Sequence, residues 1–287
     1  MILSSEWMRH GLACLGVVAF FAGCTSNETR PDDDAQAQVE RARALTTKYE
    51  AAVADERSGN YRDAYTKFME IQGSDPDYSD LSARLERYRD LVVIQQDIED
   101  LQDEPAQLRA SYHVDFGEAL RSRGPFYREQ SRNQYQAGLE LFEESFDGHF
   151  GLASLYLESG YLAEALEHFT RASAIGSDKL NRSSLAYYNL AVLHRSTTVE
   201  GADKSLAVVN ARQAVEYAAG EAMDMRRLLA EVLMEAGLAE EALKVAEDVA
   251  GREEATEGDA ARVARFKNGG QEPAKEEPKE AATEEGS

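Results

Sequence analysis

The sequence predicts an all-α fold in which helices stack as antiparallel pairs. Over residues 37–250 prolines are rare, and apolar residues recur at the spacing of one helix face. No segment alternates apolar and polar residues as a half-buried strand does. Glycines suited to turns between helices recur at roughly one or two periods of ~34 residues; they are Gly59, Gly124, Gly160 and Gly237. These observations predict a repeat of helical hairpins.

Residues 1–23 are typical of an export signal. Arg9 and His10 precede the apolar run from Gly11 to Ala22, which is shorter than the ~20 residues a spanning helix needs. The run ends in Phe21-Ala22-Gly23-Cys24, which resembles the lipobox of bacterial lipoproteins, although Leu is usual where Phe21 stands. The resemblance implies that Cys24 is the first mature residue and carries covalent lipid such as palmitate. The alternative is a plain secretory signal with an unrelated cysteine.

Residues 24–36 are predicted to be a flexible tether, because they are polar and acidic and include Pro31. In Gram-negative lipoproteins, a residue other than aspartate after the cysteine favours transfer to the outer membrane. Thr25 stands there. The resemblance therefore implies a lipid anchor in the cell envelope, on the periplasmic side of the outer membrane. The choice between inner and outer membrane stays open.

The clearest helical hairpin lies at 149–160 and 161–172, and it resembles the tetratricopeptide (TPR) repeat. That family places a large residue, Leu, a small residue and an aromatic on the first helix, then a glycine turn, then Ala, Phe and Ala. The matching residues are His149, Leu152, Ala153, Tyr156, Gly160, Ala165, Phe169 and Ala172. The resemblance implies a right-handed superhelical stack of antiparallel helix pairs, a TPR-like α-solenoid.

Further copies of this pattern extend the repeat domain over residues 37–250. A second specific match covers 226–249 and a good one covers 59–76, while weaker copies begin near His113 and Tyr187. Leu81 to Leu101 departs from the pattern and predicts one long amphipathic helix, so the repeat register is open over 78–111.

Residues 251–287 differ from the repeats. We expect the polar segment up to Phe266 to cap the last repeat. Residues 268–287 lack aromatic and large aliphatic side chains, so we expect them to be disordered.

The composition argues against nucleic-acid binding and against catalysis. The formal net charge of −22 repels a polyanion. The only cysteines are Cys14 and Cys24, so the repeats contain no thiolate for a metal cluster. The mature part has four histidines without the spacing of a zinc motif; they are His113, His149, His168 and His194. We therefore expect no metal, no cofactor besides the lipid on Cys24, and no enzymatic activity.

The predicted binding surface is the concave face formed by the first helices of the repeats. Apolar, aromatic and arginine side chains there are typical anchors for a peptide. By the resemblance, the groove positions fall on Phe150, Ser154, Leu157, Tyr188, Val192, Arg195, Arg227, Glu231 and Met234. The alternative is that these residues pack against a neighbouring repeat or tail.

The sequence thus predicts a membrane-anchored lipoprotein that acts as a protein–protein interaction scaffold in the cell envelope, with protein or peptide partners. One alternative is a pilotin-like assembly factor for an outer-membrane secretion or pilus complex. Others are a cell-wall enzyme accessory and a homo-oligomeric spacer. An enzyme is disfavoured because the C-terminal residues outside the repeats are too few for a catalytic domain.

Overall fold

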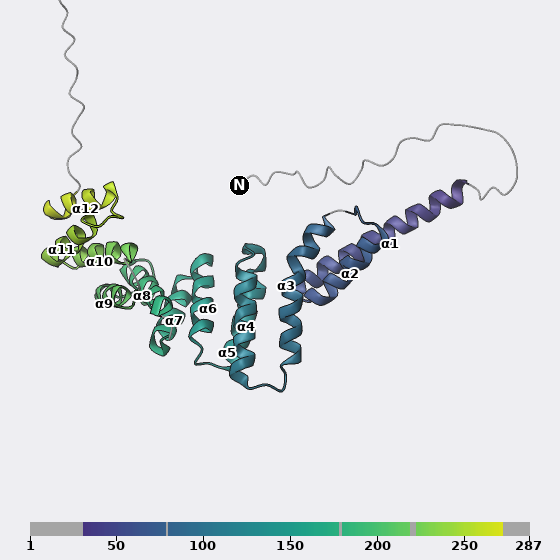
Figure 1. Ribbon diagram of the computed structural model, residues 1–287, viewed down its shortest axis with the longest axis horizontal. Coiled ribbons are helices and arrows are strands. Elements are labelled where there is room, and N and C mark those ends of the chain that lie inside the picture. Colours follow the sequence, from purple (N-terminus) through teal and green to yellow (C-terminus); the bar gives the residue numbers. More distant parts are fainter. Residues whose placement is uncertain (1–30, 79, 178–179, 219–221, 272–287) are drawn as a thin grey trace, which may run out of the picture. The chain divides into compact units, whose positions relative to one another are not determined.

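The structure is a computed structural model that describes residues 31–78, 80–177, 180–218 and 222–271 (Figure 1). Contacts divide the chain into two units, Met1–Glu50 and Ala51–Ser287. The predicted signal peptide and Cys24 lie outside the described residues, as does most of the predicted disordered tail. Within the described ranges all regular secondary structure is helical, and none of those helices is long and apolar enough to cross a bilayer.

The described residues contain twelve α-helices and one 3₁₀ helix, η1. Their bounds are α1 Pro31–Ser58, α2 Tyr61–Ser74, α3 Leu81–Asp100, α4 Ala106–Arg121, η1 Pro125–Tyr127, α5 Arg128–Leu141, α6 Phe146–Ser159, α7 Leu162–Ile175, α8 Leu180–Arg195, α9 Lys204–Tyr217, α10 Met223–Glu235, α11 Ala239–Ala250 and α12 Glu257–Lys267.

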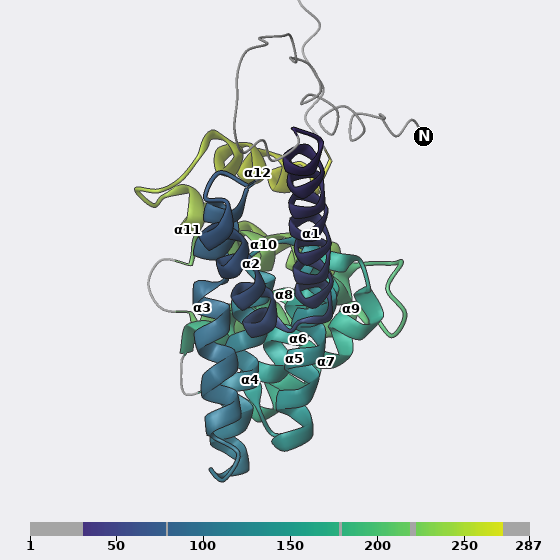
Figure 2. The ribbon, with the colours of Figure 1, turned by 90° about the vertical axis from the view of Figure 1, so that its right-hand side faces the viewer.

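Successive helices from α4 to α11 pack as antiparallel pairs, and each pair packs against the next (Figures 1 and 2). The pairs are α4 with α5, α6 with α7, α8 with α9, and α10 with α11. The prediction of an all-α solenoid is confirmed. The prediction of one long helix over 81–101 is confirmed too, because α3 is continuous from Leu81 to Asp100.

Helix α1 begins at Pro31, inside the segment predicted to be a tether. Proline fits the first turn of a helix because its missing N–H is not needed there. The last residues of the predicted tether are therefore helical.

Glycines end the first helices where the sequence predicts turns. Gly160 closes α6 in the left-handed conformation, with φ 81° and ψ 8°. Its N–H bonds the Leu157 carbonyl, and the N–H of Tyr161 bonds the Tyr156 carbonyl, so two carbonyls at the helix end are satisfied. The other three predicted turn glycines, Gly59, Gly124 and Gly237, also have positive φ.

Small side chains allow the helices of a pair to approach closely, as the repeat pattern predicts. In α6 and α7 the alanines Ala153, Ala165 and Ala172 are fully buried, and they pack around Phe169. The equivalent cluster between α8, α9, α10 and α11 is centred on Leu233 and several alanines. The core is therefore shared between successive pairs, which makes each pair depend on its neighbours.

Candidate partner-binding face

The three predicted groove residues on α6 contribute mainly to packing. The ring of Phe150 stacks on Phe146 at 5.7 Å between centroids and meets Phe169 edge-on at 5.6 Å. Leu157 is half-buried in the same cluster. Ser154 donates its hydroxyl to the Phe150 carbonyl within the helix. These three residues therefore make packing contacts, as the alternative interpretation of the groove positions predicts.

Helix α8 carries an apolar stripe that is open to solvent. Leu185 is 43% exposed and Val192 is 39% exposed, and Tyr188 lies half-buried between them. Positions i, i+3 and i+7 share one face of a helix, so the three side chains form a line. We call Leu185, Tyr188 and Val192 the α8 stripe. The sequence-based prediction of the groove did not include Leu185. It stands three residues before the predicted groove position Tyr188, and this helical spacing could have identified it.

Ion pairs at both ends of the α8 stripe join α8 to the neighbouring first helices. Arg195 donates to both carboxylate oxygens of Glu235 on α10. Its Nε lies 2.8 Å from Oε1 and 2.9 Å from Oε2. That contact raises the pKa of Arg195. At the other end, Arg182 pairs with Asp147 on α6. Arg195, which the sequence suggested as an anchor for a partner, is therefore paired within its own chain.

The same type of ion pair links another two first helices. Arg121 on α4 pairs with Glu158 on α6, and the two residues hold the same repeat positions as Arg195 and Glu235. These pairs are partly exposed, so each contributes modestly to stability. Each of them connects two neighbouring first helices.

Helix α12 covers the predicted groove residues of α10. Arg227 donates to both oxygens of Asp259 on α12, at 2.9 and 2.8 Å. Glu231 accepts from Arg262 at 2.8 Å and also from Arg265. Arg227, Glu231 and Met234 are therefore unavailable to a partner while α12 is docked, since Met234 also lies beside Gly270 after that helix.

Asp259 anchors α12 from both sides. It is 1% exposed, it accepts the backbone N–H of Thr256 at 2.8 Å, and with Thr256 it forms a capping box. The Arg227 guanidinium, together with these other donors, holds the pKa of Asp259 well below its usual range. Burial opposes ionisation of Glu231, but Arg265 and Arg262 still lower the pKa of that carboxyl.

Acid is expected to detach α12 before the rest of the solenoid unfolds. A carboxyl whose pKa is lower in the folded state stabilises folding above its unfolded pKa of ~4 and loses that contribution as the pH falls toward the folded value. Asp259 and Glu231 both shift in this direction. Methyl NMR should show Val263 of α12 losing its native shift below pH 4 while buried Val249 of α11 keeps its own. Simultaneous loss of both signals would contradict this assignment.

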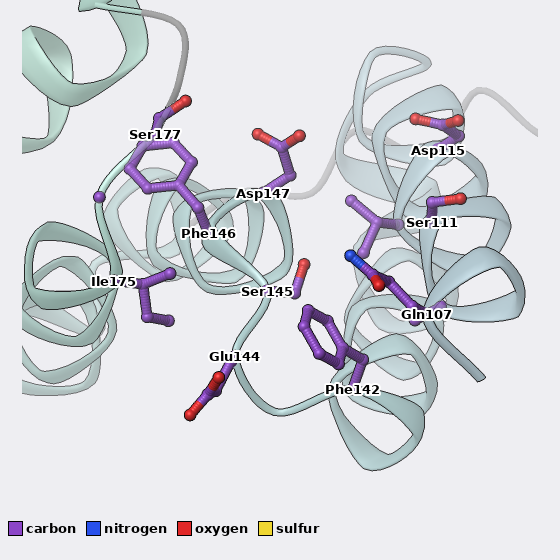
Figure 3. A pocket seen from close by; sticks show the side chains of 13 residues that line it. Gln107, Ser111, Asp115, Phe142, Glu144, Ser145, Phe146, Asp147, Ile175 and Ser177 are labelled. Atoms are coloured by element: carbon purple, nitrogen blue, oxygen red, sulfur yellow. The ribbon is translucent and has the colours of Figure 1, made fainter. Parts of the chain in front are cut away.

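A cavity of about 290 Å³ lies between α4, the turn before α6 and the end of α7 (Figure 3). Gln107 and Ser111 line its α4 side, and Phe146 and Ile175 line the opposite side. Asp147, which also lines the cavity, pairs with Arg182 one turn before Leu185 on α8. The cavity is thus connected to α8 through this ion pair, but none of the three stripe residues lines it.

The four histidines of the repeat region contact their own chain, and two of them contact each other. His194 accepts the backbone N–H of Asp203 at 3.1 Å, and His113 contacts Gln134 at 2.8 Å. The Nδ1 atoms of His149 on α6 and His168 on α7 lie 2.9 Å apart. Sequence spacing did not indicate this pair because the helical hairpin brings together residues far apart in the chain.

Comparison with known proteins identifies the fold. No protein-family model matches the chain, and no curated protein matches it. Among solved structures, YrrB, described as a TPR protein with an unusual peptide-binding site, matches with a TM-score of 0.50 and 18% identity. The match covers 59% of this chain and 81% of YrrB. The protein MamA matches with a TM-score of 0.42 and 13% identity, over 72% of this chain and 90% of MamA. The first likeness shows that the chain has a TPR-like fold.

Proposed function

We propose that this protein is a lipid-anchored scaffold of the bacterial cell envelope that binds a protein partner along the α8 stripe. The observation that carries the proposal is the row of Leu185, Tyr188 and Val192, of which the first and last are substantially exposed. Apolar residues aligned on one helix face are a common docking surface for an amphipathic or extended segment. The solved TPR protein with a peptide-binding site is in keeping with a peptide-like partner.

The neighbouring helices make this surface suitable for binding. Because Arg182–Asp147 and Arg195–Glu235 link α8 to α6 and α10, the stripe is presented by a preorganised set of helices. Preorganisation lowers the entropy lost on binding. Full burial of a leucine side chain contributes about 1.5–3 kcal/mol, and Leu185 and Val192 are still 43% and 39% exposed. Covering each of them can therefore contribute roughly 1 kcal/mol toward the ~8 kcal/mol of a micromolar complex.

The membrane anchor belongs to the same proposal and rests on the sequence at Cys24. Two or more acyl chains suffice for stable attachment to a bilayer. Metabolic labelling with a palmitate analogue should mark the wild-type chain and leave Cys24→Ser unlabelled. Label retained by Cys24→Ser would remove the lipoprotein part of the proposal, and fractionation of the labelled chain would distinguish inner from outer membrane.

Replacing Leu185 with aspartate is expected to weaken partner capture by about 10-fold or more, because the variant loses roughly 1 kcal/mol of apolar burial and also places a carboxylate in the interface. Affinity capture from envelope extracts, followed by quantitative mass spectrometry, would compare wild type, Leu185→Asp and Tyr188→Ala. Leu206→Asp is the matched control, because Leu206 on α9 is similarly exposed at 41% but lies outside the stripe. Equal loss in Leu185→Asp and Leu206→Asp would refute the assignment of this face.

A further inference from the structure

A pocket of about 460 Å³ lies between the start of α5 and the end of α6. The polar side chains that line it are Arg128, Glu129 and Arg132 of α5, Tyr156 and Ser159 of α6, and Tyr161 of the turn that follows α6. None of the three residues of the α8 stripe lines it. The pocket is therefore a separate site from the surface proposed above for a protein partner.

Arg132 is a half-buried cation without a partner of its own. In the part of the chain that the structure describes, its guanidinium makes no hydrogen bond and no ion pair. Other arginines that face a neighbouring helix do pair with a carboxylate, as Arg121 does with Glu158 and Arg212 with Glu241. A charge that is partly removed from water gains most from an acceptor of opposite charge. Arg132 is therefore available to an anion that the chain itself does not supply.

Arg128 adds a second positive charge on the same face of α5, because residues four apart in a helix are neighbours on its surface. Within the described ranges its guanidinium is paired with no carboxylate, and it donates to the backbone carbonyl of Glu158 at 3.4 Å. Glu129 carries the one carboxylate among the lining residues, and its side chain is exposed. With two arginines against one glutamate, the pocket is positive in a chain whose formal net charge is −22.

Two tyrosines give the pocket an aromatic wall. The rings of Tyr156 and Tyr161 meet edge-on, with centroids 6.1 Å apart and planes at 80°. His168 stacks on Tyr156 at 5.6 Å and holds that ring in place, whereas Tyr161 is 57% exposed. The exposed ring of Tyr161 can stack on a flat ring of a ligand. Neither tyrosine hydroxyl has a hydrogen-bond partner among the described residues, so both can donate to a ligand.

We propose that this pocket binds a small ligand that has a ring and one terminal oxyanion group, a phosphate or a carboxylate. Arg128 and Arg132 hold the oxyanion through charge-assisted hydrogen bonds, for which the planar guanidinium is suited, and Tyr161 packs on the ring. The negative charge of the whole chain opposes an extended polyanion, so a compact ligand with a single anionic group fits better. The volume of the pocket lies within the range of about 300–1,000 Å³ that is typical of small-molecule sites.

The test is isothermal titration calorimetry of the purified full chain at low ionic strength, with phenyl phosphate, benzoate and neutral benzyl alcohol as separate probes. Wild type should bind phenyl phosphate or benzoate but not benzyl alcohol, and the tighter of the two anions identifies the kind of oxyanion. Arg132→Gln should weaken this binding by about tenfold or more, since it removes the charged donor. Arg109→Gln is the matched control and should bind like wild type, because Arg109 on α4 is also half-buried but lies outside the pocket.

Tyr161→Ala covers the case in which Arg132→Gln folds poorly, because an exposed ring can be removed without opening the core. This variant should bind the preferred anion several-fold more weakly than wild type and keep the circular dichroism spectrum of wild type. Full affinity of Tyr161→Ala would overturn the proposal, and so would equal affinity of wild type and a folded Arg132→Gln chain. Failure of wild type to bind either anion, or equal binding of benzyl alcohol, would overturn it as well.

Discussion

Replacing Gly151 with alanine is expected to destabilise the protein by about 3 kcal/mol, at the upper end of the usual cost of overpacking a core. A Cβ atom on Gly151 would stand 2.3 Å from Cε1 of Tyr135, inside van der Waals contact. The tyrosine ring has little room to move, because it already packs against the backbone of Gly117, where an added Cβ would stand 2.9 Å from Cδ1 and Cε1. Its hydroxyl also donates to Glu118 at 2.7 Å. Urea unfolding followed by circular dichroism measures the change.

Gly73→Ala is the control for this substitution. Gly73 lies in α2, and a Cβ there would have no atom within 4 Å. Alanine favours the helix relative to glycine by roughly 0.5–1 kcal/mol, so this variant should be as stable as wild type or slightly more stable. If both variants unfolded at the same urea concentration, the close packing of α5 between α4 and α6 would be wrong.

Removing the Glu56 side chain is expected to cost about 1–3 kcal/mol, the usual penalty for leaving a buried hydrogen-bonding group unsatisfied. Glu56 is 3% exposed and accepts from Arg84 at 2.7 Å. It also accepts the Tyr88 hydroxyl, and Tyr127 approaches the same oxygen at 3.5 Å. Glu56→Ala would leave the buried Tyr88 hydroxyl without the carboxylate that accepts from it, and Arg84 would keep its more exposed pair with Asp80. Burial and the contact with Glu56 raise the pKa of Tyr88, so that ring stays neutral and keeps donating.

Glu86→Ala gives the comparison for Glu56, because Glu86 is an exposed glutamate on α3. Surface substitutions of this kind change stability by less than about 0.5 kcal/mol. Thermal unfolding of the two variants should therefore differ by several degrees. A Glu56→Ala chain as stable as Glu86→Ala would show that the cluster of Glu56, Arg84 and Tyr88 does not hold α1, α3 and η1 together.

The fold could be predicted from the sequence because its signals are local. In the hairpin of α6 and α7, the small residues Ala153 and Ala165, the aromatic Phe169 and the turn at Gly160 all lie within one repeat. Their spacing alone specifies two helices and the face that each buries. The same reasoning identified α3 as one helix. It did not place the start of α1, because Pro31 is compatible both with a tether and with a first helical turn.

The candidate site was harder to predict because it depends on contacts between distant parts of the chain. Arg195 and Arg227 were read as anchors for a partner, yet each pairs with a carboxylate far along the sequence, Glu235 and Asp259. Repeat position indicates which way a side chain points but not whether another helix covers it. The docking of α12 over α10 therefore required the structure, and so did the meeting of His149 with His168.

The most direct test of the account is photo-crosslinking in living cells, with a photoreactive amino acid in place of Val192 in the α8 stripe. The account predicts one discrete adduct with another envelope protein, lost when Leu185→Asp is added, and no such adduct from the same amino acid at Val93, which is exposed on α3. Adducts that are identical from both positions, or that persist in Leu185→Asp, would contradict the claim that the first-helix face at α8 is where this protein binds its partner.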